Sequence, residues 1–107
     1  MQTPVDTSDP MAVQAEVCSI YRRLFRDEGA RPVLRAFQWA LTCFSGRCPG
    51  YLAIDARYHD LEHTMQGTLC LARLIEGRDR SGILPRITRE VFDLSLLAIL
   101  FHDMGYL

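Results

Sequence analysis

The chain has 107 residues, 49% of them apolar, and its twelve arginines and thirteen carboxylates leave a formal charge of −1. This length and balance predict one ordinary globular domain at most. No basic block stands apart along the chain, so a nucleic-acid polymer is not expected as a partner.

Neither a membrane span nor a secretory signal is predicted. The longest apolar stretch, 94–101, is far shorter than the roughly 20 residues that cross a bilayer. The first residues, MQTPVDTSDP, lack the basic end and apolar stretch of a signal peptide. The cytoplasm is therefore the default compartment. There the four cysteines are expected to be reduced, with two disulfides as the alternative.

A first helix is predicted over residues 10–28, behind a flexible tail of residues 1–9. Asp9 and Pro10 resemble an N-cap followed by proline at the first helical position. Apolar residues then recur every three or four positions, which indicates an amphipathic surface helix that Gly29 can end.

A second helix is predicted from Pro32 to about Ser45, with Trp39 beside its apolar stripe. Residues 46–57 contain Gly and Pro without a sustained period, so we expect a connecting loop. A third helix should follow this loop.

The third helix is predicted over about 58–76, ending at Gly77, before a second loop over 77–87. Thr88 is expected to cap a fourth helix that reaches about Met104. This last helix is apolar almost all round, which is typical of a helix surrounded by protein.

These elements predict an all-α fold, a helical bundle of about four helices, since no strand-like alternation of useful length occurs. Three other helices offer the apolar fourth helix too few partners. An underfilled core of this kind suggests a homo-oligomer that associates through exposed apolar surface.

The three histidines lie in two short segments. His59 and His63 are in YHDLEHT at the start of the third helix, and His102 is in FHDMG at the end of the fourth. Residues four apart on a helix share one face, with their Cβ atoms about 5–6 Å apart. Two imidazoles could therefore serve one site.

Asp103 follows the most apolar run in the chain and sits in a last helical turn, where the helix dipole disfavours an anion. An arginine or a divalent cation could compensate this carboxylate, and the adjacent His102 favours the cation. Imidazole and carboxylate ligands suit Zn, Fe or Mn, and an open coordination position leaves room for a nucleophilic water.

The segment YHDLEHT, followed some forty residues later by LLAILFHDMG, resembles the HD superfamily of metal-dependent phosphohydrolases. It is similar in particular to the branch with the YHxxxH signature that includes the cyclic-nucleotide phosphodiesterases. The resemblance covers roughly residues 55–107, and it implies that residues 10–107 form the N-terminal portion of an HD-type helical domain.

The resemblance implies that His63, His102 and Asp103 bind a divalent metal cation (Zn, Fe, Mn or Mg). It implies that His59 donates a proton to the leaving alkoxide, a role that suits imidazole because it titrates near neutral pH. The implied substrate is a phosphorylated small molecule or nucleotide, hydrolysed as a phosphoester by a metal-activated water.

Two departures from the family pattern bear on activity. The phosphodiesterases carry Asn where this chain has Asp60, and the family's fourth ligand, an Asp on a later helix, has no counterpart in these residues. With three of four protein ligands, we expect weaker metal binding and an incomplete hydrolase. Arg57 and Arg73 could meet a substrate phosphate, although surface arginines are the commoner interpretation.

Two alternatives remain open. The chain could be a non-catalytic helical module, derived from an HD domain, that binds a partner through exposed apolar surface. It could also be a helical bundle in which His102 and Asp103 are structural and no metal binds.

Overall fold

The computed structural model describes residues 4–26, 29–44 and 57–102, with the backbone alone for residues 57–60. This part of the chain forms helices and no strands, which confirms the predicted all-α bundle of about four helices. The helices are α1 (Pro10–Leu24), α2 (Arg31–Phe44), α3 (Arg57–Arg80) and α4 (Arg89–Phe101).

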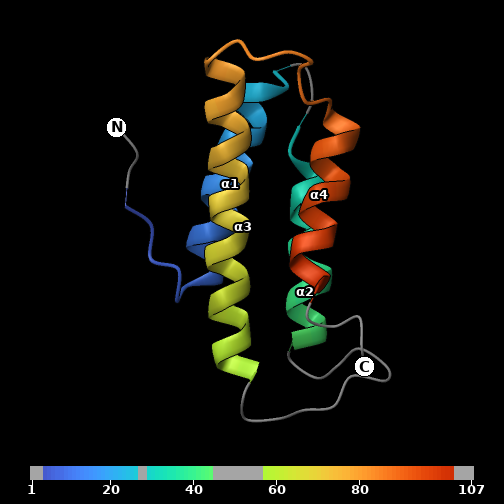
Figure 1. The fold of residues 1–107 in the computed structure, drawn as a ribbon. Helices are drawn as coiled ribbons and strands as arrows, with labels where there is room; N and C mark the ends of the chain where they lie inside the picture. Colours follow the sequence, from blue (N-terminus) through green and yellow to red (C-terminus); the bar gives the residue numbers. More distant parts are fainter. Residues whose placement is uncertain (1–3, 27–28, 45–56, 103–107) are drawn as a thin grey trace.

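The four helices form two antiparallel pairs that lie side by side (Figure 1). Helices α1 and α3 run in one direction and α2 and α4 in the other, and each helix packs against two neighbours. The antiparallel contacts are α1 with α2 and α3 with α4. The parallel contacts are α1 with α3 and α2 with α4.

The core receives buried side chains from all four helices. An aromatic cluster joins α1 to α4: Tyr21 lies edge-on to Phe25 and to Phe92, with ring centroids 5.0 and 5.3 Å apart. Phe25 and Phe92 are 5.9 Å apart in the same manner. Such edge-to-face pairs add about 0.5–1.5 kcal/mol each to what their burial contributes.

Helix α1 begins as predicted and ends earlier. The carboxylate of Asp9 accepts a hydrogen bond from the Met11 backbone N–H at 3.0 Å, as an N-cap does. The predicted extension to residue 28 is wrong, because the helix ends at Leu24 and Phe25 leaves helical geometry with φ −127°. This exit lets the Phe25 ring join the aromatic cluster.

Helix α2 spans nearly the predicted range, and Trp39 flanks its buried stripe with 62% of its surface exposed. The ring of Trp39 lies edge-on to Phe101 of α4, with centroids 5.7 Å apart. Of the predicted loop over 46–57, residues 46–56 lie outside the described residues and residue 57 already belongs to the next helix, α3.

Helix α3 continues past Gly77, where the sequence predicted its end, and reaches Arg80. Gly77 stays helical because the Glu76 carboxylate pairs with Arg80 across this turn at 3.6 Å. The glycine that ends the helix is Gly82, whose φ of +71° lies in the left-handed region.

Helix α4 begins as predicted, since the Thr88 hydroxyl accepts from the Val91 backbone N–H at 3.2 Å. The prediction that protein surrounds this helix on every side is wrong. One face is buried through Phe92, Leu96 and Leu100, whereas Leu94 is 68% exposed. The expected shortage of core partners is thereby confirmed for the described part of the molecule.

The remaining compositional predictions concern cysteines and membranes. Cys18 and Cys43 are buried free thiols and Cys70 is an exposed one, as expected, while Cys48 lies outside the described residues. Across residues 4–26, 29–44 and 57–102, none of the helices has the length and apolar character of a bilayer span.

Candidate functional site

Two of the four candidate site residues are described with their side chains. His63 lies on α3 and His102 follows the last residue of α4, and both side chains are exposed. Residue 59 belongs to α3, but its side chain lies outside the description, as does Asp103. The geometry therefore concerns the two imidazoles, one from each half of the motif.

A close approach between α3 and α4 fixes their relative register. A β-carbon at Gly67 would lie 3.4 Å from Cδ1 of Ile99, so these two residues face each other across the helix pair. His63 precedes Gly67 by four residues and therefore shares its face of α3. His102 follows Ile99 by three residues and shares its face of α4.

The start of α3 and the end of α4 lie at the same end of the bundle (Figure 1). At about 1.5 Å per residue, position 63 lies about 6 Å along α3 from the Gly67 contact, and position 102 about 4.5 Å along α4 from Ile99. Helix periodicity thus puts the two backbone positions at similar depth near this end of the helix pair.

His102 is held by its own helix. Its Nδ1 lies 2.7 Å from the Ile99 carbonyl oxygen, which can only accept a hydrogen bond, so Nδ1 carries the proton. The lone pair of the neutral ring is then on Nε2, the atom that points away from the helix backbone in this tautomer. Metal-binding histidines commonly donate one ring N–H to a carbonyl in this way.

The end of α4 also favours a cation on electrostatic grounds. His102 is the C-cap of α4, where the unpaired carbonyls carry partial negative charge. The described side chains include no group of three or more His, Cys, Asp or Glu residues placed to hold a metal ion. Two histidines alone are a partial ligand set, and the other two candidates fall outside the description.

Arg73 does not belong to this face. Its guanidinium lies 3.7 Å from the Glu16 carboxylate, on the side of α3 that packs against α1. Arg73 is therefore a partly buried member of the α1–α3 contact, with a side chain that is 19% exposed. The side chain of Arg57 lies outside the description.

Sequence reasoning missed Gly67, which lies opposite Ile99 in the α3–α4 contact. The signal was present, because a glycine inside a helix costs about 1 kcal/mol relative to alanine and needs a packing reason. Its position, four residues after His63, placed it on the candidate face.

The comparisons with known proteins leave the site to be argued from its own geometry. Family models, curated proteins and solved structures were compared with the chain, and none of them matches it.

Proposed function

We propose that this chain contributes the first metal-binding half of an HD-type phosphohydrolase, with His63, His102 and Asp103 as ligands of a divalent cation. The observation that supports the proposal is the Gly67–Ile99 contact, from which helix periodicity predicts that positions 63 and 102 share the facing sides of α3 and α4. Without this contact the motif would be only a spacing in the sequence.

The chain's own residues have separate tasks in this proposal. In this proposal His102 offers Nε2 to the cation because its Nδ1 donates to the Ile99 carbonyl, and His63 is the ligand from the neighbouring helix. Residue 59 lies one turn before His63 on α3, and the resemblance to the HD superfamily gives His59 the role of proton donor to the leaving oxygen of the substrate. A bound divalent cation would supply a water of lowered pKa as the nucleophile.

Metal content of purified protein tests the ligand set. We expect one divalent metal per chain in the wild type, and a loss of at least about tenfold in affinity for both His63→Ala and His102→Ala. Gln66→Ala, an exposed change on the same helix, is the control and should keep the metal. Equal metal content in all four proteins would contradict the proposal.

Hydrolysis of bis(4-nitrophenyl) phosphate tests the reaction separately. His59→Asn should retain metal and lower the turnover by about 10²–10⁴-fold, the usual contribution of a general acid. If the wild-type protein binds metal at His63 and His102 but does not hydrolyse phosphoesters, the proposed metal site stands and the proposed reaction is contradicted.

A second candidate function is a non-catalytic interaction module, and exposed apolar side chains favour it. Leu74 of α3 is 66% exposed, and Val91 and Leu94 of α4 are 45% and 68% exposed. Exposed apolar area beyond a few hundred Å² commonly marks an interaction surface. Sedimentation of wild type and Leu94→Lys tests it, because a complex through this surface should dissociate in the variant.

A further inference from the structure

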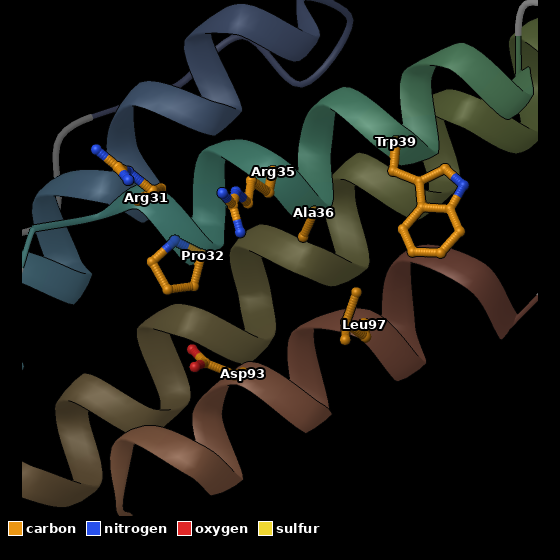
Figure 2. A pocket seen from close by; sticks show the side chains of 7 residues that line it. All are labelled: Arg31, Pro32, Arg35, Ala36, Trp39, Asp93 and Leu97. Carbon is orange, nitrogen blue, oxygen red and sulfur yellow. The ribbon is translucent and has the colours of Figure 1, made fainter.

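The parallel helices α2 and α4 leave an open groove between them (Figure 2). The groove has a volume of about 390 Å³, within the range of about 300–1,000 Å³ typical of small-molecule sites. Its lining side chains include Arg31, Pro32, Arg35, Trp39, Asp93 and Leu97.

One part of the groove is apolar. Trp39 hangs from α2 over the groove and Leu97 points into it from α4 (Figure 2). Both are large apolar side chains that remain exposed, at 62% and 37%. The indole face and the leucine together offer a surface on which an apolar or aromatic group can lose its contact with water.

The other part of the groove is charged with both signs. Arg31 and Arg35 lie one turn apart on α2 and Asp93 lies across the groove on α4, with the Arg31 side chain extending away from Asp93 (Figure 2). Of the ion pairs formed by the described residues, none joins Asp93 to Arg31 or Arg35. Two guanidinium groups and a carboxylate thus meet one groove without neutralising one another.

Asp93 lacks part of its hydrogen bonding. Its Oδ1 atom is buried and makes no hydrogen bond within the described residues. Burial raises the pKa of this carboxyl group, against the opposing effects of the Tyr21 hydroxyl and of Arg89. A positive charge in the groove would favour the ionised form of this carboxyl group.

We propose that this groove binds the zwitterion of an α-amino acid with an aromatic or large apolar side chain. The ligand carboxylate lies against the forked guanidinium of Arg35, with Arg31 one turn away, and its ammonium group pairs with the Asp93 carboxylate at the edge of the groove. The ligand side chain lies on Trp39 and Leu97. Each recognised group meets the complementary charge or surface, and the proposal is independent of the histidine site.

Trp39 makes the site directly measurable, because it is the single tryptophan of the chain. Excitation at long ultraviolet wavelength reports the indole alone, and phenylalanine does not absorb there. We expect titration with phenylalanine to change the Trp39 emission with saturation. Two truncated probes, 3-phenylpropionate without the ammonium group and phenethylamine without the carboxylate, should each bind at least about tenfold more weakly.

Variants assign the two charged contacts. Arg35→Gln should weaken phenylalanine by about tenfold or more and leave phenethylamine unchanged, whereas Asp93→Asn should weaken phenylalanine and leave 3-phenylpropionate unchanged. Arg22→Gln removes the same charge from an exposed position on α1 outside the groove, and it should bind like wild type. Circular dichroism of each variant verifies that it is folded.

Three results would overturn the proposal. Absence of saturable phenylalanine binding would remove the groove as a site for this class of ligand. Equal affinity for phenylalanine and 3-phenylpropionate would remove the role of Asp93 as the ammonium site. Equal affinity in wild type and Arg35→Gln would reduce the observation to an apolar contact with Trp39.

Discussion

The two contacts between parallel helices differ in whether their charged side chains form an ion pair. Between α1 and α3, Arg23 donates two hydrogen bonds to Glu76, from Nε to Oε2 at 2.6 Å and from Nη2 to Oε1 at 3.1 Å. Between α2 and α4, Arg35 and Asp93 face a common groove without an ion pair. In the α1–α3 contact, which we call the closed contact, the charges hold the two helices together. In the α2–α4 contact, which we call the open contact, the charges remain available to a ligand.

The pKa values of the two carboxyl groups, Glu76 and Asp93, are shifted in opposite directions. The hydrogen bonds from Arg23 lower the pKa of Glu76, although burial acts against them. Burial raises the pKa of Asp93, because the hydrogen bond from Tyr21 and the charge of Arg89 compensate it only in part. Glu76 therefore stabilises the fold as an anion, whereas Asp93 destabilises it.

The largest expected effect is at the closed contact. Glu76→Ala should lower the free energy of unfolding by about 2 kcal/mol, because it removes charged hydrogen bonds from a buried carboxylate and leaves Arg23 unpaired. Glu62→Ala, an exposed change on the same helix, is the control and should cost less than about 0.5 kcal/mol. Urea unfolding followed by circular dichroism measures both, and equal losses would contradict the assigned role.

Local sequence signals predicted the helices and their starting points well. Asp9-Pro10 and Thr88 act through groups within three residues along the chain, so their caps are readable without the fold. The ends of α1 and α3 were wrong because tertiary partners decide them. Phe25 lies beyond the end of α1, where its ring packs against Phe92. The ion pairs of Glu76 with Arg23 and Arg80 hold Gly77 inside α3.

The open contact should respond with the opposite sign. Asp93→Asn is expected to raise the free energy of unfolding at neutral pH by roughly 1 kcal/mol, because the amide keeps the side-chain shape without the cost of a buried charge. The same urea measurement applies. A loss of stability in this variant would mean that the carboxylate has a partner in solution that the groove geometry does not show.

The candidate sites were predictable to different degrees. The histidines were found because His59, His63 and His102 concentrate in two motifs, and their facing arrangement needed only helix periodicity and one contact at Gly67. The α2–α4 groove could not be found in this way. Arg35 and Asp93 are far apart in sequence, and only the parallel packing of their helices brings them to one surface.

Lowering the pH should remove both the stabilisation by Glu76 and the destabilisation by Asp93. Glu76 has a folded pKa below its unfolded value, so its stabilisation is present at neutral pH and is lost as the pH falls through the two values. Asp93 has a folded pKa above its unfolded value, so its destabilisation at neutral pH disappears as the pH falls. We therefore measure the free energy of unfolding between neutral pH and a pH of about 3. Glu76→Gln should be less stable than wild type at neutral pH and Asp93→Asn more stable, and both differences should shrink as the pH falls. Differences that stay constant over this range would contradict the assigned titrations.

The smallest effect compares one arginine from each contact. Arg35→Gln should change the free energy of unfolding by less than about 0.5 kcal/mol, because its guanidinium forms no ion pair with the other residues that the structure describes. Arg23→Gln should cost about 1 kcal/mol, since it breaks the pair with Glu76 while its own side chain is 47% exposed. A large loss in Arg35→Gln would show that Arg35 already holds Asp93, and the groove would then be a second closed contact. A small loss in the free energy of unfolding is the result expected for a ligand site, because the charge of Arg35 then pairs with a bound ligand instead of with another side chain of the fold.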